Sequence, residues 1–218
     1  MDFLQQLDTE ALVAINQAYC PYLDRLMTLV AGKFTWALML LALVWINARK
    51  GWRQTLVVIV AMAITILIAD RVASGLIKPW VMRLRPTHDP ALGDAIHVID
   101  GYRGGMYGFV SSHASNTLAV ALLVMLWLKN RWATIALTAW VALVCYCRMY
   151  QGVHYPGDIV GGALVGTAAA LAVFAAWRGL SRRHAALDVS FTANDGKALS
   201  IAIFANILIL CILAIIPI

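Results

Sequence analysis

Charged residues are scarce in this chain. They make up 13% of its 218 residues, whereas apolar residues make up 62% and the mean hydropathy is +0.78. A soluble globular domain carries a charge on about a quarter of its residues. The composition therefore excludes an ordinary soluble domain and indicates a helical protein that crosses a membrane several times.

Cysteine is also sparse. The spacing of the four cysteines fits neither a zinc site nor a disulfide framework, and most of them lie in or beside apolar runs. We expect them to be small buried side chains. They are Cys20, Cys145, Cys147 and Cys211.

The N-terminus lacks the basic segment of a cleavable signal. Its first residues, MDFLQQLDTE, are acidic where such a signal would be basic. Insertion is therefore expected to depend on the apolar runs themselves. Internal repeats and low-complexity tracts are absent from the sequence, so we expect a single membrane-embedded domain over residues 1–218.

The net charge of +6 is dispersed. The basic residues occupy short turns between apolar runs and form no stripe of the kind that binds nucleic acid. We therefore expect no nucleic-acid partner. The charge instead favours contact with anionic lipid headgroups or phosphates.

Six apolar runs each approach the roughly 20 residues that a helix needs to cross a bilayer. They predict an all-α fold, a polytopic bundle of six transmembrane helices. The two middle runs are separated by only three residues and should form a tight antiparallel hairpin. The runs lie at about 26–47, 55–77, 113–129, 132–149, 157–177 and 199–217.

Residues 2–18 have an amphipathic helical pattern. Leu4, Leu7 and Leu12 share one face, whereas Asp2 and Asp8 lie opposite. The pattern is too polar to span the membrane and predicts an N-terminal interfacial helix that Pro21 ends. An equally good interpretation is that this helix only covers the end of the bundle.

Lysine and arginine gather in the turns after the first, third and fifth runs, on one side of the membrane. That side should be cytoplasmic. The N-terminus, the 78–112 loop, the 148–156 turn and the C-terminus then face outward. Several basic residues on the outer side contradict this charge rule, so a different role must explain their presence. They are Lys78, Arg83, Arg85, Arg103 and Arg148.

The 86–112 connection is the longest, and long loops without regular structure are often functional lids. Its segment 101–109, GYRGGMYGF, is rich in glycine and aromatic residues. We expect a mobile flap at the level of the headgroups.

The segment 147–158, CRMYQGVHYPGD, combines Arg148, His154 and Asp158 between apolar runs. Ionisable groups near the hydrocarbon usually face a polar interior or a functional site. An arginine that binds an oxyanion, a histidine that attacks it and an aspartate that orients the histidine suggest phosphoryl chemistry. The glycines that follow in the fifth run are interpreted as close helix packing.

Two further polar clusters precede this segment. Asp70, Ser74 and Lys78 recur every four residues and share a helical face, which should point into the bundle. The alternative is that Lys78 and Arg85 merely extend to headgroups.

Ser111 and Ser112 come where a helix N-cap is expected, and His113 follows in the first turn. A helix N-terminus is favourable for an anion. The alternative is a simple cap beside an interfacial histidine.

Together the clusters read K-x6-RP, SSH and R-x5-H-x3-D over residues 78–158. This order and spacing resemble the three-part signature of the type 2 phosphatidic acid phosphatase family, K-x6-RP, PSGH and SR-x5-H-x3-D. The six-run layout is similar to the family's membrane lipid phosphatases. Val110 and Ser112 stand where the family has proline and glycine, and Cys147 stands where it has serine.

The resemblance implies the roles of the site residues. His154 would attack phosphorus and carry a phosphohistidine, and Asp158 would hold its other ring nitrogen. His113 would protonate the leaving oxygen and later activate water. The phosphate would be bound by Lys78, Arg85, Ser111, Ser112 and Arg148. We expect neither a metal nor a cofactor, since the cations supply the electrostatic stabilisation and the loop carboxylates Asp89, Asp94 and Asp100 are scattered.

By the same resemblance, the substrate is a membrane lipid phosphate or diphosphate. Undecaprenyl diphosphate is the leading expectation. Lipid A and phosphatidylglycerophosphate or phosphatidate are the alternatives. The protein is expected in a bacterial inner membrane, with its site facing the periplasm or cell exterior, and its oligomeric state is left open.

Two non-enzymatic interpretations stay open at this point. A transporter would spread charged residues through several spans and break spans in corresponding halves. An inactive relative would bind lipid phosphate without cleaving it, since Val110 and Cys147 replace family residues.

Overall fold

The computed structural model describes residues 3–32 and 34–216. Asp2, Lys33 and Pro217, which fall in expected elements, lie outside the described residues, as does the side chain of Asp94. The expected all-α fold is confirmed. Its helices are α1 (Phe3–Gln17), α2 (Pro21–Val30), α3 (Ala37–Ala48), α4 (Trp52–Asp70), a π-helical segment (Arg71–Ile77), α5 (Lys78–Val81), α6 (Ser112–Leu128), α7 (Arg131–Tyr150), α8 (Pro156–Ser181) and α9 (Ala193–Leu213), with short 3₁₀ turns at Pro86–His88, Gly93–Ala95, Ile99–Gly101 and Ala185–Leu187.

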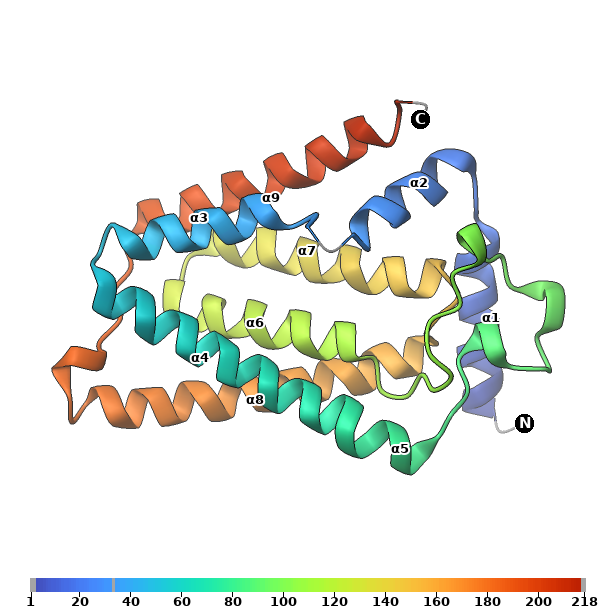
Figure 1. Cartoon of the computed structure of the whole chain (residues 1–218), viewed down its shortest axis with the longest axis horizontal. Helices are drawn as coiled ribbons and strands as arrows, with labels where there is room; N and C mark the ends of the chain where they lie inside the picture. Colours follow the sequence, from blue (N-terminus) through green and yellow to red (C-terminus); the bar gives the residue numbers. More distant parts are fainter. Residues whose placement is uncertain (1–2, 33, 217–218) are drawn as a thin grey trace.

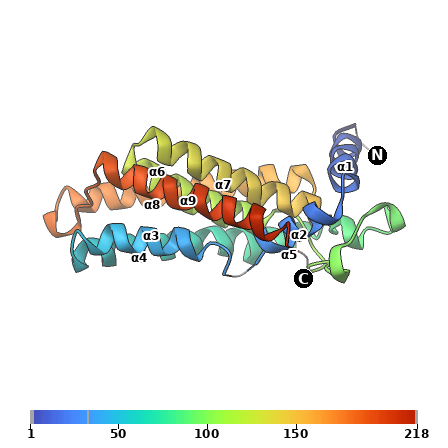
Figure 2. The ribbon, with the colours of Figure 1, turned by 90° about the horizontal axis from the view of Figure 1, so that it is seen from above.

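The long helices run side by side around α6, whereas α1 lies across one end of the bundle (Figures 1 and 2). Helix α6 packs against α4, α7 and α8. Ala119, Ala121 and Leu123 on α6 are fully buried. Small residues at such positions let helix backbones approach closely, which is how membrane helices associate without a hydrophobic driving force.

Within the described residues, four helices are long and apolar enough to cross a membrane. They are Trp52–Val81, in which α4 continues through the π-helical segment into α5, and α7, α8 and α9. Helices α3 and α6 are apolar but shorter. A multi-pass membrane protein is therefore confirmed, whereas the count of six complete spans is not.

The first expected span, 26–47, is divided into α2 and α3. Helix α3 alone is about 18 Å long, too short for a hydrocarbon core of about 30 Å. Side chains bind the backbone groups freed at the break: Thr35 donates to the Leu29 carbonyl, Trp36 Nε1 to the Val30 carbonyl at 3.3 Å, and Asn206 Nδ2 to the Thr35 carbonyl at 2.8 Å. Non-helical backbone at membrane depth persists where such partners bind it.

The three basic turns meet at the end of the bundle opposite α1 (Figure 1). Lys50 Nζ forms an ion pair with Asp195 Oδ2 at 2.8 Å, and Asn130 Nδ2 donates to the Ala193 carbonyl at 3.2 Å. Asn130 also caps α7 in the tight hairpin expected between the middle runs. The polar clusters of residues 78–158 gather at the other end.

Helix α1 forms where the amphipathic pattern predicts a helix, and its polar face contacts the bundle. Leu4 and Leu7 are exposed, whereas Asp8 and Asn16 turn towards the bundle. Asn16 Nδ2 donates to the carbonyls of His97 and Tyr150 at 2.9 and 2.7 Å. Pro21 begins α2 instead of ending α1, as its fixed φ favours a first helical position.

Candidate active site

His154 lies in the turn between α7 and α8 and is fully buried. Its Nδ1 is 3.2 Å from Asp158 Oδ2. Pro156 at the start of α8 brings Asp158 into the first helical turn, where Oδ2 also accepts the Tyr155 N–H at 3.0 Å. His154 Nε2 is buried and has no hydrogen-bond partner among the described residues.

The surroundings of His154 keep its imidazole neutral. Burial lowers its pKa well below the ordinary value, and the positive charges of Arg85, Lys78 and Arg148 lower it further. Asp158 accepts a hydrogen bond from Nδ1, so the ring proton is assigned to Nδ1. The lone pair then lies on Nε2, in the form that a nucleophile requires.

His113 and Arg148 come together from α6 and α7. Ser111 caps α6 by accepting the Ala114 N–H at 3.3 Å, which places His113 in the first turn. Arg148, in the last turn of α7, donates from Nη1 to His113 Nε2 at 3.2 Å and from Nη2 to Gln151. The side chain of Arg148 is buried, and its Nε has no partner within the described part of the chain.

Lys78 and Arg85 approach the same place from the end of the second span. Lys78 Nζ donates to the carbonyls of Gly108 and Val110 at 3.1 and 2.6 Å. Arg85 donates from Nε to the Tyr107 carbonyl at 3.2 Å and from Nη1 to the Val153 carbonyl at 3.4 Å. Burial and the charge of Arg148 lower the pKa of Arg85. Cations held this close together favour an anion between them.

The two serines differ in their environment. Ser111 is fully buried, and its N–H donates to the Asp158 carbonyl at 2.9 Å. Ser112 Oγ lies 2.8 Å from Ser74 Oγ, which donates to Asp70 Oδ1 at 3.0 Å. The face of Asp70 and Ser74 therefore points into the bundle, and the Ser74 hydroxyl connects the Asp70 carboxylate to the Ser112 side chain.

The structure accounts for the remaining departures from the family signature. The Cys147 thiol donates to the Met27 carbonyl at 3.3 Å, in contact with α2. Val110 is buried and its carbonyl accepts a hydrogen bond from Lys78.

Gly162 and Gly166 lie against the backbone carbonyls of Ser111 and Ser115, as expected for close packing.

Two residues of this region have no site role in the interpretation from the sequence, although Arg83 is among the outer cations that contradict the charge rule. Arg83 forms ion pairs with Asp158 at 3.2 Å and with Asp8 at 2.7 Å. Arg83 lies inside the K-x6-RP segment, two residues before Arg85, and the signature leaves its position unspecified. Asp8 lies on the polar face of the expected amphipathic helix, opposite the leucines.

The 86–112 loop is bound at several points. Thr87 N donates to the Gly152 carbonyl at 3.2 Å, and His97 pairs with Asp24 at 3.0 Å. Tyr102 and Met106 near its end are exposed, and Tyr102 presents its ring to the Arg148 guanidinium at 5.6 Å. The loop therefore contributes both backbone carbonyls and an aromatic side chain to the site.

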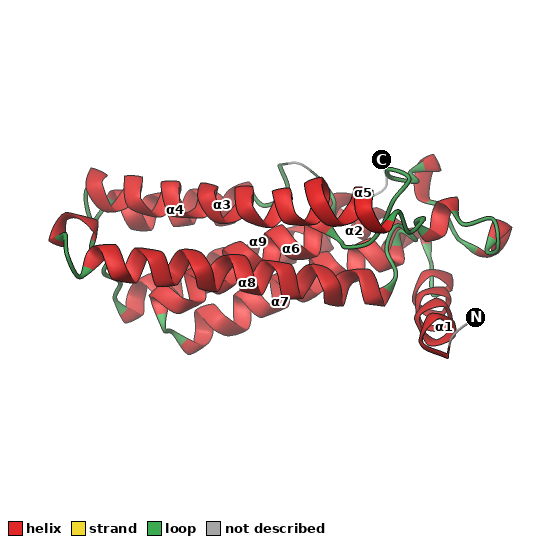
Figure 3. Cartoon of the chain, turned by 90° about the horizontal axis from the view of Figure 1, so that it is seen from below, coloured by secondary structure: helices red, strands yellow, loops and turns green. Residues whose placement is uncertain are grey.

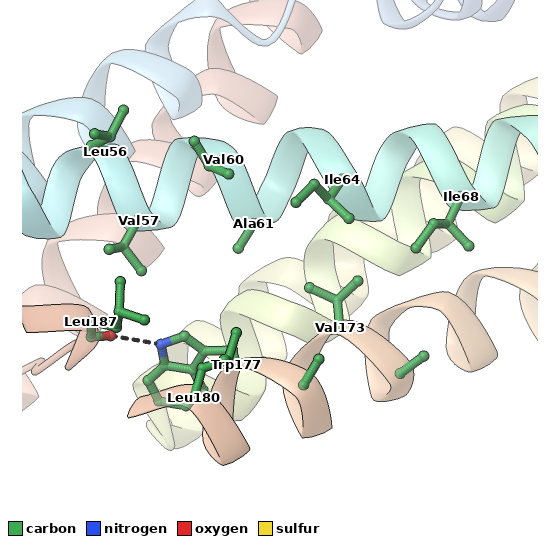
Figure 4. Close-up of a pocket in the computed structure, with 12 residues that line it drawn as sticks. Leu56, Val57, Val60, Ala61, Ile64, Ile68, Val173, Trp177, Leu180 and Leu187 are labelled. Atoms are coloured by element: carbon green, nitrogen blue, oxygen red, sulfur yellow. Dashed lines mark hydrogen bonds between the residues drawn. The ribbon is translucent and has the colours of Figure 1, made fainter. Parts of the chain in front are cut away.

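A cavity of about 230 Å³ adjoins His113 and Arg148. Its walls include Trp36, Trp140 and residues of the break between α2 and α3. A different hollow of about 490 Å³ lies between α4 and α8 and is lined by apolar side chains and Trp177, whose indole donates to the Leu187 carbonyl at 2.9 Å (Figure 4). That hollow carries no titratable group for catalysis.

No three His, Cys, Asp or Glu side chains among the described residues come together as metal ligands. Asp89 Oδ2 accepts the Tyr155 hydroxyl at 2.9 Å, and Asp100 is exposed. The charged groups that surround His154 are cations and one carboxylate, Asp158.

Comparison with known proteins places this arrangement among lipid phosphatases. The family model described as the PAP2 superfamily matches residues 54–182. A lipid A 4'-phosphatase of Bacteroides thetaiotaomicron is 34% identical over 168 residues, 76% of this chain and 75% of that protein. An Escherichia coli K12 protein named as a candidate undecaprenyl-diphosphatase is 25% identical, over 75% of this chain and 78% of that protein.

A similar fold occurs in a solved structure. The PAP2-type phosphatidylglycerolphosphate phosphatase of Bacillus subtilis gives a TM-score of 0.57 with 23% identity, covering 84% of this chain and 89% of that one. The likeness extends the family match from the sequence to the arrangement of the helices.

Proposed function

The chain belongs to the PAP2 superfamily of membrane phosphatases, and on that premise we propose that it hydrolyses a phosphomonoester of a lipid A-type lipid. The more similar relative, at 34% identity, is named a lipid A 4'-phosphatase, and the candidate undecaprenyl-diphosphatase is 25% identical. Undecaprenyl diphosphate, the leading expectation from the sequence, therefore becomes the second candidate.

The observation that carries the proposal is the environment of His154. Its Nδ1 is held by Asp158, its buried Nε2 has no partner within the described residues, and its pKa is lowered by burial and three cations. A neutral imidazole beside positive charge is suited to attack on phosphorus, because the cations bind the phosphoryl oxygens and stabilise the transition state.

In the proposed reaction, His154 Nε2 forms a bond to phosphorus as the bond to the lipid oxygen breaks. The imidazolium form of His113 gives a proton to that oxygen. The neutral ring that results takes a proton, in the second step, from the water that releases phosphate. Arg148, whose Nη1 lies 3.2 Å from His113 Nε2, binds a phosphoryl oxygen and so keeps the acid–base group beside the phosphate. Lys78, Arg85 and Ser111, with the Ser112 N–H, complete the phosphate-binding group.

The cavity beside His113 supports a lipid leaving group. It opens from His113 and Arg148 towards the break between α2 and α3, and Trp36 and Trp140 form part of its wall. The departing alcohol would lie on the His113 side of the phosphate. The two tryptophans can pack against the apolar face of a sugar ring, and the polar contacts concentrate at the phosphate.

Location follows from the charge distribution. The basic turns lie at the end of the bundle opposite the connection between α7 and α8, and such turns favour the cytoplasm. We therefore place the protein in a bacterial inner membrane with its site facing the periplasm. The alternative of a transporter is disfavoured because the residues of the proposed site, among them Lys78, Arg148 and His154, gather at one end of the bundle.

Phosphate release by the purified protein tests the function. The panel contains lipid A, undecaprenyl diphosphate, phosphatidate and phosphatidylglycerophosphate, each in the same detergent. We expect the highest kcat/KM with lipid A. A higher value with undecaprenyl diphosphate would select the second candidate.

Two variants test the chemistry. His154→Ala should abolish turnover, and Asp158→Asn should lower kcat by about 10⁴-fold, as loss of an orienting carboxylate does in a catalytic triad. The inactive-relative interpretation requires that the wild-type protein binds these lipids without releasing phosphate. Wild-type turnover in His154→Ala would exclude the proposed nucleophile.

A further inference from the structure

Arg83 connects the carboxylate behind His154 to the N-terminal helix. Its Nη1 donates to Asp158 Oδ1 at 3.2 Å, and its Nη2 donates to Asp8 Oδ2 at 2.7 Å. The other oxygen of Asp158 lies 3.2 Å from His154 Nδ1. A continuous series of charged hydrogen bonds therefore runs from α1 to the imidazole.

Asp8 also binds the start of α8. Its Oδ1 accepts the Gly157 N–H at 2.6 Å, and Gly157 is the second residue of that helix. Backbone N–H groups at this position have no partner within their own helix. A Cβ at position 157 would come within 2.9 Å of Asp8 Oδ2, so glycine permits the approach. Asp8 thus caps α8 from a different helix and complements its dipole.

The contacts among Asp8, Arg83 and Asp158 are largely shielded from solvent. The side chain of Asp158 is inaccessible, and those of Asp8 and Arg83 are 12% and 28% exposed. A buried carboxylate needs a charged partner. The guanidinium also lies over the Tyr155 ring at 3.9 Å, which fixes its plane. A planar fork can bind two carboxylates at once in a way that a lysine cannot.

We propose that Arg83 and Asp8 are positioning residues for the phosphatase reaction. Arg83 binds Oδ1 of Asp158 and so directs Oδ2 towards the His154 ring. Asp8 fixes both Arg83 and the N-terminus of α8, which carries Asp158. Helix α1, which lies across the bundle (Figure 3), is therefore a part of the catalytic support as well as an interfacial helix. This inference rests on the proposed function, since it assumes that His154 is the nucleophile.

The expected effect is on turnover more than on binding. In the proposed site, the phosphate is bound by residues other than Arg83 and Asp8. A misplaced imidazole lowers the rate because reaction requires an aligned nucleophile. Loss of either side chain should therefore lower kcat and leave KM nearly unchanged.

The experiment measures kcat and KM for Arg83→Gln, Arg83→Lys and Asp8→Asn with the lipid that the panel shows to be hydrolysed fastest. We expect Arg83→Gln to lower kcat by about 100-fold, as small misplacements of reacting groups do, and Asp8→Asn to lower it by about tenfold. Arg83→Lys keeps the charge and should recover part of the loss.

The double variant Asp8→Asn with Arg83→Gln separates this role from simple anchoring of α1. Asp8→Asn keeps an amide oxygen that can accept the Gly157 N–H, so it removes chiefly the charge that binds Arg83. If Asp8 acts on His154 through Arg83, the double variant should be no slower than Arg83→Gln alone. Losses that multiply would show that Asp8 acts independently and would overturn the proposed series.

Two matched controls accompany these variants. Glu10→Gln changes an exposed acid on the same helix that contacts Gln6, and Arg131→Gln changes an exposed arginine at the other end of the bundle. Both should keep the wild-type kcat. If Arg83→Gln does not fold, Asp8→Asn, which keeps Arg83, provides the deciding kcat.

The two proposals fail in different ways. An active wild-type protein with undiminished kcat in Asp8→Asn and Arg83→Gln would overturn the positioning role alone. A folded wild-type protein that releases phosphate from none of the lipids would overturn the proposed function and this inference with it.

Discussion

The two ring nitrogens of His154 lie in opposite environments. Nδ1 faces a carboxylate, whereas Nε2 is buried near three cations. Protonation of Nε2 would place a further positive charge among those cations in a desolvated site. The imidazole therefore stays neutral at pH values where an exposed histidine would be charged.

This environment predicts the acid limb of the pH profile. Because the pKa of His154 is lowered, the neutral form persists below the ordinary histidine pKa of about 6.5 and is lost only as the pH falls through the lowered value. We expect protonation of His154 to cause no fall in kcat/KM as the pH is lowered to 6.5. The measurement is kcat/KM between pH 4 and 8, roughly the range in which histidine and phosphate ionise.

A variant distinguishes the histidine from the substrate phosphate. Removing a cation in Arg85→Gln should raise the pKa of His154 and move the acid limb to higher pH, since the charge of Arg85 lowers that pKa in the wild type. The substrate ionises at the same pH with both proteins. Identical acid limbs would contradict the assignment to His154.

For Cys147, we predict that substitution changes the rate very little. Its thiol contacts the Met27 carbonyl on α2. Restoring the family residue in Cys147→Ser should therefore keep a hydrogen bond to α2 and change kcat by less than about threefold, which corresponds to less than 1 kcal/mol in the barrier. A large gain in kcat would show that position 147 contacts the phosphate in the reacting complex.

Local spacing explains which residues could be predicted. Arg148, His154 and Asp158 lie on one turn and the helix ends beside it, so their proximity follows from the sequence. Arg83 and Asp8 are 75 residues apart. The local sequence around Arg83 or Asp8 does not indicate which residue each one binds. An aspartate on the polar face of an amphipathic helix is usually expected to face solvent.

At the scale of elements, the close packing of α8 on α6 brings Asp158 to Ser111. A Cβ at Gly162 would clash with the Ser111 carbonyl, which is backbone and cannot rotate away. Gly162→Ala should therefore force the two helices apart and destabilise the protein by about 1–3 kcal/mol, as overpacking does.

The matched control for this substitution lies on the same helix. A Cβ at Gly179 would meet no atom within 4 Å among the described residues, so Gly179→Ala should be neutral or slightly stabilising. Thermal unfolding in detergent compares the two variants. Equal unfolding temperatures would show that α6 and α8 adjust to the added methyl group.

The break between α2 and α3 was not predicted, for a physical reason. Hydropathy averaged over a window remains high through Gly32 and Thr35, because the flanking residues are apolar. The bonds that stabilise the break include one from Asn206 on α9, a partner distant in sequence. The longer helices, by contrast, follow from their unbroken apolar length.

At the scale of the whole molecule, the charge pattern predicts orientation. The C-terminal end of α9 lies towards the site end of the bundle, away from the basic turns (Figure 1). A reporter enzyme fused to the C-terminus and active only outside the cytoplasm should be active. The same reporter inserted after Lys129, in the α6–α7 turn, should be inactive. The reverse pattern would place the site on the cytoplasmic side.

The bond between Asp8 and Gly157 has a consequence for the order of assembly. It joins residues 149 positions apart, and such contacts form late because a long chain segment must close first. During synthesis, α1 emerges well before α8. The Asp8 carboxylate therefore has neither Gly157 nor Asp158 nearby when α1 first reaches the membrane surface. Insertion of α8 then completes both the cap and the support of His154, so a shorter, still growing chain would lack a finished catalytic centre.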